Sequence, residues 1–321
     1  GFVAMAQGQE AEAERLMTES LERARALAEA DGEGSSGPRG LVPLFASNLS
    51  RLFLAQGRLE EAVPLMREAL AGFERSHGMN HPSALTAMSN LAALYNRMGR
   101  FDEAEPLLLR VLETQREVLG ADHADTLTTL NNYGYNQKAQ GRLEEAREIY
   151  VDALERRVAT LGPEHPHVLS SLSNVGTVQR ELRDLDASAR TLTESLERHL
   201  VVLGPDHRDT QYSRLDLATT RAAQGDLAGA TDLLEAAARG ARAGMPGDPA
   251  FAVGCLMRRG QYLRQLDRDG EAADSLLQAA EMGAEELGTE HRLTRASITT
   301  LVTVLRELGD EETAAEWEAR L

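Results

Sequence analysis

The chain has 321 residues, a formal net charge of −17 at pH 7, and 42% hydrophobic residues. This apolar content supports a sizeable core and excludes a disordered chain, while the negative charge argues against general binding of nucleic acid or of an anionic membrane. No apolar run approaches the roughly 20 residues of a membrane span, and the chain does not begin with a signal segment, so we expect a cytoplasmic protein.

A short segment recurs along the chain with a fixed spacing. QGRLEEA at residues 56–62 returns as MGRFDEA at 98–104 and again as QGRLEEA at 140–146, which gives a period of 42 residues. A histidine keeps the same period and, after one skipped copy, returns near the C-terminus: His81, His123, His165, His207 and His291. Two independent markers with one period predict a repeat architecture.

Each repeat is predicted to contain two helices. Apolar residues recur at helical spacing over Ser83–Arg97, and Gly99 then ends the helix. A second helix is expected to begin near Phe101, and Asp125 or Thr126 can cap the first helix of the next repeat. Alternating strand-like segments bounded by hairpin turns do not occur, so the sequence predicts an all-α chain.

These repeats resemble the tetratricopeptide repeat (TPR) family. The small and aromatic residues of the family's first helix match Ala92 and Tyr95, and its turn glycine matches Gly99. Its second helix is matched by Ala104 and Leu108. The 42-residue period, the loop LGADHADT at 119–126 and the run LNN at 130–132 resemble the kinesin light chain type of TPR. The resemblance implies a right-handed superhelical solenoid of stacked antiparallel helix pairs, with seven full hairpins after a partial first one.

We expect one continuous solenoid over residues 1–321, because each repeat needs its neighbours to bury its apolar face. The first copy, with its turn at Gly8, begins inside its leading helix, so we expect it to belong to a longer polypeptide. Two later copies lack the turn glycine and have Arg183 and Asp267 in its place. The expected parts are a partial repeat over residues 1–31, a loop over 32–40, regular repeats over 41–205 and degenerate repeats over 206–321.

An asparagine stands nine residues before the turn in four consecutive copies: Asn48, Asn90, Asn132 and Asn174. First helices line the concave side of such a solenoid, and an amide both donates and accepts, so this row can hydrogen-bond the backbone of an extended peptide. In chaperone-binding TPR domains, asparagine at this position holds a ligand's carboxylate or backbone, and the resemblance implies the same role here. The alternative is that these amides bond to the neighbouring repeat and stabilise stacking.

Further polar, basic and aromatic residues follow on the same face. Besides the asparagine row, we assign to the peptide-binding face Arg51, Asn96, Arg97, Asn131, Tyr135, Lys138 and Arg180, with Tyr212 as a further aromatic residue. The cations would anchor a partner's carboxylates through charge-assisted hydrogen bonds. The alternative is that the arginines pair with neighbouring acids along the groove. Most of the acidic excess lies on second helices, which we expect to form a solvated outer face.

We expect no catalytic site, no metal and no cofactor. The loop histidines recur once per repeat, about 10 Å apart in stacked helix layers, whereas zinc–nitrogen bonds are about 2 Å long, so we interpret them as structural residues. Cys255 lies on an apolar helix and is interpreted as a buried small side chain. Motifs for a phosphate-binding loop, a zinc-binding helix or a nucleophile elbow do not occur in the sequence.

The sequence therefore predicts a non-catalytic protein–protein interaction scaffold whose concave groove binds an extended, carboxylate-bearing peptide segment of a partner protein. The alternative is a regulatory or sensor arm of a larger bacterial signalling enzyme, a kinase or an NTPase, of which this chain is a fragment. Lys138 is the only lysine, and such a preference for arginine is typical of GC-rich bacterial genomes. Homo-oligomerisation through the terminal repeats is a further possibility, whereas nucleic acid and membranes are not expected as partners.

Overall fold

The computed structural model describes residues 10–30, 37–245 and 247–321. Over these residues the chain forms fifteen α-helices and one short π-helix and contains no β-strand, which confirms the predicted all-α fold. The helices group into two compact units, Gly1–Arg156 (unit 1) and Arg157–Leu321 (unit 2), and the boundary lies within α8 (Leu143–Leu161). One solenoid over the whole chain stays a prediction. Within the described ranges, no helix is both long and apolar enough to cross a membrane.

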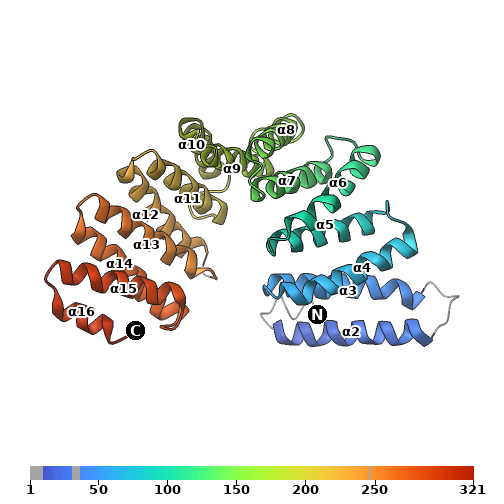
Figure 1. The fold of residues 1–321 in the computed structure, drawn as a ribbon, viewed down its shortest axis with the longest axis horizontal. Coiled ribbons are helices and arrows are strands. Elements are labelled where there is room, and N and C mark those ends of the chain that lie inside the picture. The colour runs from blue at the N-terminus through green and yellow to red at the C-terminus, as the bar shows by residue number, and fades with distance from the viewer. Residues whose placement is uncertain (1–9, 31–36, 246) are drawn as a thin grey trace. The chain divides into compact units, whose positions relative to one another are not determined.

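In unit 1 consecutive helices pack against one another in chain order (Figure 1). Hairpins α3–α4 and α5–α6 follow α2, and α7 pairs with the first part of α8. The turn predicted at Gly8 lies outside the described residues, as do residues 31–36; of the predicted loop over 32–40, residues 37–40 instead belong to α3. The helices are α2 (Glu10–Ala30), α3 (Gly37–Ala55), α4 (Leu59–His77), α5 (Pro82–Arg97), α6 (Phe101–Val118) and α7 (Ala124–Ala139).

Unit 2 continues the same pattern with four hairpins, α9–α10, α11–α12, α13–α14 and α15–α16, again packed in chain order. Trp317, on the last helix, is buried beside Ala314 and Leu305. The helices are α9 (Pro166–Glu181), α10 (Leu185–Val202), α11 (Arg208–Ala223), α12 (Leu227–Gly244), α13 (Pro249–Gln265), α14 (Asp269–Met282), the π-helix η2 (Gly283–Leu287), α15 (Arg292–Glu307) and α16 (Glu311–Glu318).

The turn between the two helices of a repeat uses one residue in the left-handed region. Gly99 has a φ of 73°, and the N–H of the next residue, Arg100, donates to the carbonyl of Tyr95 at 2.8 Å. This hydrogen bond closes the helix end in the manner of a Schellman motif. Arg183 and Asp267 keep the same conformation without glycine, with φ values of 66° and 56°. The backbone of the turn is therefore preserved in the degenerate repeats.

The loop histidines cap the first helices. The Nδ1 atom of His123 accepts a hydrogen bond from the N–H of Asp125 at 3.2 Å. The same contact recurs at the four equivalent residues: His81, His165, His207 and His291. The structural interpretation of these histidines is thus confirmed, whereas the assignment of the cap to Asp125 or Thr126 was wrong. The Thr126 hydroxyl instead donates to the carbonyl of Gly120 at 2.9 Å.

A glycine in the first helices α7 and α9 lets the second helix approach closely. A Cβ atom on Gly134 would lie 2.7 Å from the ring of Tyr150, and a Cβ atom on Gly176 would lie 2.5 Å from Leu192 Cγ. Real side chains do not tolerate such distances, so the large residue of the second helix occupies the space that the missing Cβ leaves. In each unit, therefore, the size of a residue on a first helix is matched to that of its neighbour on the second helix.

Unit 1 also contains a buried hydrogen-bonded pair of amides. Asn96 is 6% exposed and Asn136 is fully buried. The Asn136 Nδ2 atom donates to Asn96 Oδ1 at 2.7 Å and to the carbonyl of Phe101 at 3.1 Å. Asn96 therefore faces the interior, and its assignment to the peptide-binding face was wrong. The reason is Asn136, which puts a polar group at a core position and draws the Asn96 amide toward it.

Four more side chains extend this pair toward the surface. Gln140 Nε2 donates to Asn136 Oδ1 at 2.7 Å and to Glu105 at 3.2 Å. Glu105 also accepts from Gln137 at 3.0 Å and from Arg142 at 2.9 Å. Burial alone would raise the pKa of Glu105, but the hydrogen bonds from Arg142, Gln140 and Gln137 outweigh it, and its pKa lies below the usual value. The carboxylate thus stays charged at the joint between two repeats.

Replacing Asn136 by leucine tests this pair, because leucine occupies the equivalent positions Leu52 and Leu94. The substitution leaves the buried Asn96 amide without its partner, so we expect a loss of about 1–3 kcal/mol in the free energy of unfolding, measured by urea denaturation. In the double variant Asn96→Leu/Asn136→Leu no buried amide of the pair is left unpaired, and part of the loss should be recovered; the Phe101 carbonyl and Gln140 still lack their Asn136 partner. A single variant as stable as the wild type would contradict this account.

A second buried polar position recurs on the second helices. Arg157 is 4% exposed, and its Nη1 atom donates to Ser171 Oγ at 2.8 Å. The equivalent residue one repeat later is His199, which is 2% exposed. Its Nδ1 atom lies 2.8 Å from the carbonyl of Ser195 and 3.0 Å from Ser213 Oγ. Burial lowers the pKa of His199 below its ordinary value.

The buried imidazole makes the stability of unit 2 depend on pH. The pKa is lower in the folded chain than the value of about 6.5 expected when unfolded, so below that pH the unfolded chain binds the proton first and folding becomes less favourable. We expect His199→Gln, which introduces the residue found at the equivalent Gln115, to lose less stability than the wild type between about pH 7.5 and about pH 5. Urea unfolding at both pH values measures this.

His167 provides the control for that experiment. Burial, together with the nearby Arg157 and His165, also lowers the pKa of His167, so the His199→Gln variant should keep part of the pH dependence. His167→Gln combined with His199→Gln should remove more of it. Equal pH dependence in the wild type and in both variants would show that neither imidazole titrates on unfolding.

Candidate peptide-binding face

Three first helices of unit 1 place one asparagine each in register. Asn48 lies on α3, Asn90 on α5 and Asn132 on α7, and all three are half-buried. Their side-chain amides make no hydrogen bond to any residue that the structure describes. These three residues are called the amide row below. The stacking interpretation requires hydrogen bonds to the neighbouring repeat, and the amide row makes none within the described part of the chain.

Basic and aromatic side chains lie beside the amide row. Arg51 is exposed on α3, one turn after Asn48, and Tyr135 is 45% exposed at the equivalent place on α7. Arg97 is exposed at the end of α5, where its Nη1 atom donates to the carbonyl of Leu54 at 3.2 Å. Neither guanidinium lies within ion-pair distance of a carboxylate among the described residues. Both therefore keep their charge available beside the row.

The remaining predicted residues of α7 belong to the same helix but differ in their surroundings. Asn131 and Lys138 are half-buried and take part in interactions with other residues of the chain. Asn96 is excluded from the face because it is buried against Asn136. The face that the structure brings together in unit 1 thus consists of the amide row with Arg51, Arg97 and Tyr135.

Unit 2 does not continue the amide row in the same form. Asn174, on α9, is half-buried and has interactions within the chain. The next position in the row is Asp216, on α11, whose backbone carbonyl accepts from Arg180 Nη1 at 3.2 Å and whose carboxylate lies 3.7 Å from the same nitrogen. For Arg180 the structure thus favours pairing with a neighbouring acid. Tyr212 is 38% exposed and packs edge-on against Phe251.

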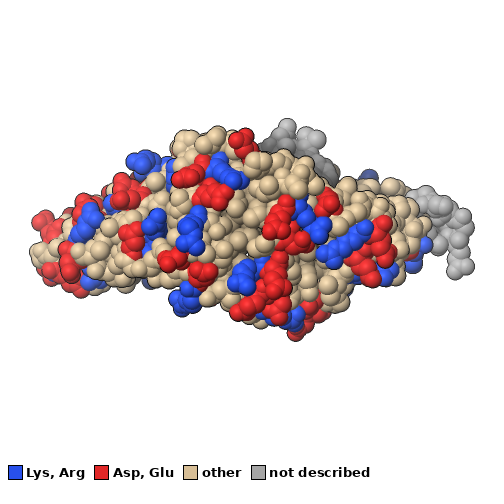
Figure 2. Space-filling view, turned by 90° about the horizontal axis from the view of Figure 1, so that it is seen from above, with Lys and Arg blue, Asp and Glu red and all other residues tan. Residues whose placement is uncertain are grey.

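The charge of the first helices differs from that of the whole chain. In unit 1, α3 and α5 contain no acidic residue and α7 contains one, Asp125. The acids lie instead on second helices, where many are paired within one turn, as Arg100 is with Glu103 at 2.5 Å. Figure 2 shows basic and acidic side chains interspersed on the face in view. The amide row therefore lies in the acid-poor part of an acidic protein.

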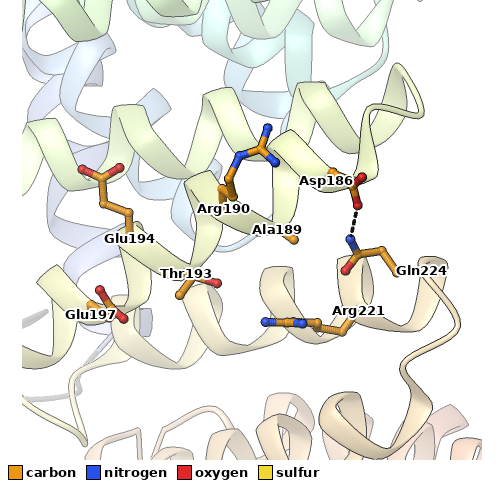
Figure 3. A pocket seen from close by; sticks show the side chains of 8 residues that line it. All are labelled: Asp186, Ala189, Arg190, Thr193, Glu194, Glu197, Arg221 and Gln224. Atoms are coloured by element: carbon orange, nitrogen blue, oxygen red, sulfur yellow. Dashed lines mark hydrogen bonds between the residues drawn. The ribbon is translucent and has the colours of Figure 1, made fainter.

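The surface hollows formed by the described residues are lined by side chains of mixed character. The one in Figure 3 has a volume of about 440 Å³ and lies against α10 and the end of α11. It mixes Arg190 and Arg221 with acidic side chains, and Gln224 donates to Asp186 at 2.9 Å. Among the described residues, no cluster of three or more histidine, cysteine or acidic side chains is placed to hold a metal ion.

The single cysteine is placed as the sequence predicted. Cys255 is 2% exposed on α13, and burial raises the pKa of its thiol to about 12. Because the thiolate is the reactive form of cysteine, such a shift keeps Cys255 in its unreactive, protonated form. Its interpretation as a buried small side chain is confirmed.

Comparison with known proteins identifies the repeat. A family model described as Tetratricopeptide repeat matches residues 43–113, 83–157 and 136–200, and a second model of the same description matches residues 211–236. Together the matches cover more than half of the chain. A comparison with curated proteins gives no match.

Solved structures agree with the family models. BtubC (BKLC) from P. vanneervenii is 25% identical, with a TM-score of 0.59 over 74% of this chain and 92% of that chain. The Rap conjugation gene regulator of the plasmid pLS20, in complex with the Phr peptide, is 14% identical, with a TM-score of 0.58 over 87% and 71%. A Signal Transduction ATPase with Numerous Domains with a tetratricopeptide repeat sensor, from Pyrococcus horikoshii, is 15% identical, with a TM-score of 0.65 over 87% and 41%. The last two likenesses show the fold alone. The chain belongs to the tetratricopeptide repeat family.

Proposed function

We propose that unit 1 binds an extended peptide segment of a partner protein and that the amide row holds the backbone of this segment. The observation that carries the proposal is that Asn48, Asn90 and Asn132 present half-buried amides, in register on three helices, without a hydrogen-bond partner among the described residues. A peptide backbone offers an N–H and a C=O at each residue, which an amide can match. The proposed activity is binding, without catalysis.

Three hydrogen bonds from the amide row cannot by themselves account for the affinity of a peptide ligand. Each hydrogen bond contributes about 1 kcal/mol net, so the amide row contributes about 3 kcal/mol, which is less than a millimolar affinity requires. Side-chain contacts must therefore provide most of the affinity. Arg51, Arg97 and Tyr135 are the exposed groups beside the row that can make them.

The charge of the face favours a ligand with carboxylates. Arg51 and Arg97 have no acidic partner in the described structure, and the helices α3 and α5 have no acidic residue. A carboxylate placed there gains a charge-assisted hydrogen bond without displacing an existing ion pair. Because both guanidiniums are exposed, this part of the affinity should weaken as salt screens the charges.

Two of the similar folds support peptide recognition or regulation as uses of this architecture. The Rap regulator was solved with a peptide bound, which supports peptide binding as the proposed function. The likeness to 41% of a larger ATPase that has a tetratricopeptide repeat sensor supports the second candidate, a regulatory arm of a signalling enzyme. That candidate uses the same face and differs in its consequence, since binding would change an activity encoded beyond these residues. The reading frame on both sides of the chain distinguishes the two.

Removing two amides tests the proposed function. Nine-residue peptides that bind the wild-type chain are selected from a random display library, and their affinity for Asn90→Ala/Asn132→Ala is measured by fluorescence anisotropy. Two lost hydrogen bonds of about 1 kcal/mol each should weaken binding by roughly 30-fold. Because these side chains are half-buried and make no hydrogen bond to a described residue, the melting temperature should hardly change.

Asn80→Ala is the matched control, since Asn80 is an exposed asparagine in the loop before α5 and its Oδ1 accepts from Arg110. It should leave the affinity unchanged. Unchanged affinity of the double variant, accompanied by a clear fall in its melting temperature, would instead assign the amide row to stacking between repeats and would refute the proposal.

A further inference from the structure

The amide row of unit 1 lies between two strips of different character. Residues four before and three after a given residue lie on the same side of a helix. On the N-terminal side of the row these positions hold Leu44, Thr86 and Thr128, and Leu41 lies a further turn away; we call these four residues the apolar strip. On the C-terminal side lie Arg51 and Tyr135, with Arg97 a further turn away, and we call these three the basic strip.

The exposed leucines of the apolar strip both lie on α3. Leu41 is 42% exposed and Leu44 is 46% exposed. The hydroxyl of Thr128 donates to the carbonyl of Ala124 at 2.8 Å, so this polar group is already used within α7. Asp125, the one acid of these three helices, lies one turn beyond Thr128 and disfavours a carboxylate on this side.

An extended peptide bound along the amide row would direct its side chains to both strips. In a strand the backbone N–H and C=O groups lie in one plane, and successive side chains point to opposite sides of that plane. We consider a peptide that runs across the helices along the amide row, with backbone N–H and C=O groups directed at the row. Its side chains then point alternately toward the N-terminal and the C-terminal ends of the helices. At a rise of 1.5 Å per residue, the near residues of the apolar and basic strips lie about 6 Å and about 4.5 Å from the row, within the reach of those side chains.

We infer that the segment bound by unit 1 alternates apolar and acidic residues, with the apolar side chains on the apolar strip and the carboxylates on the basic strip. This inference rests on the proposed function, because it requires the backbone to lie along the amide row. With helices packed 8–10 Å apart and a strand rise of about 3.3 Å per residue, roughly six residues reach from Asn48 to Asn132, and roughly nine cover the full width of α3, α5 and α7. The ligand is thus a short amphipathic strand of the partner protein.

Two peptides of identical composition test the alternation. In one capped peptide of about ten residues leucine and glutamate alternate, and in the other the leucines precede the glutamates. Fluorescence anisotropy with the full chain, at concentrations where light scattering shows both peptides to be monomeric, should give an affinity at least tenfold higher for the alternating peptide. A third peptide, with lysine in place of glutamate, should also bind at least tenfold more weakly than the first.

Variants in the two strips test which strip contacts the acidic side chains of the peptide and which contacts its apolar side chains. Arg51→Glu/Arg97→Glu should reverse the preference, so that the alternating lysine peptide binds more tightly than the glutamate peptide. Leu44→Ser should weaken binding of the leucine–glutamate peptide but not of a peptide in which serine and glutamate alternate. Both sets of side chains are exposed, so the variants should fold, and circular dichroism verifies this.

The outcomes separate this inference from the proposed function. Equal affinities for the alternating and the block peptide, both lowered in Asn90→Ala/Asn132→Ala, would overturn the alternation and support backbone capture. Affinities that do not respond to the asparagine substitutions would refute backbone capture itself. Failure of the alternating peptide to bind at all would overturn the inference, while the library-selected peptides would still decide the proposed function.

Discussion

A TPR hairpin cannot bury its apolar face alone, and this dependence on the next hairpin governs the rest of the structure. The two helices of each repeat must return antiparallel across a short turn, which requires one residue in the left-handed region. Gly99 supplies it at little cost, while Arg183 and Asp267 adopt it although side chains disfavour it. That these two positions keep the turn shows that burial between neighbouring hairpins outweighs the local strain. The first helices are thereby kept in register, and so is the amide row.

Much of the fold followed from the period of the sequence. The 42-residue spacing and the helical pattern predicted the hairpins, because each apolar position recurs where the neighbouring repeat must cover it. The role of the loop histidines was predicted as structural, but their capping contact was not, since histidine is not among the usual capping residues. His123 shows that an imidazole nitrogen two residues before a backbone N–H can serve as well.

The site was harder to derive from sequence than the fold. A helical face can be assigned from spacing only when the core side of the helix is apolar, and in α7 the core position is Asn136. Its amide draws Asn96 into the interior, which no pattern within α5 alone revealed. The signal in the sequence was that asparagine replaces leucine at this core position. The equivalent residues in the two preceding repeats are Leu94 and Leu52. For Arg180, the partner Asp216 likewise stands in the next repeat, so the pairing depends on how the repeats stack.

The close fit between a glycine and a large neighbour has a consequence for how such an array can change over time. Gly134 accommodates Tyr150, whereas the preceding repeat pairs Ala92 with Leu108 at the same two places. A helix taken from one copy and set into another would bring a methyl group against a ring, or leave a void beside a smaller side chain. Although the copies share one length and one pattern, they are not interchangeable parts. An array with its repeats in another order would therefore be less stable than the native one, because these paired sizes would no longer meet.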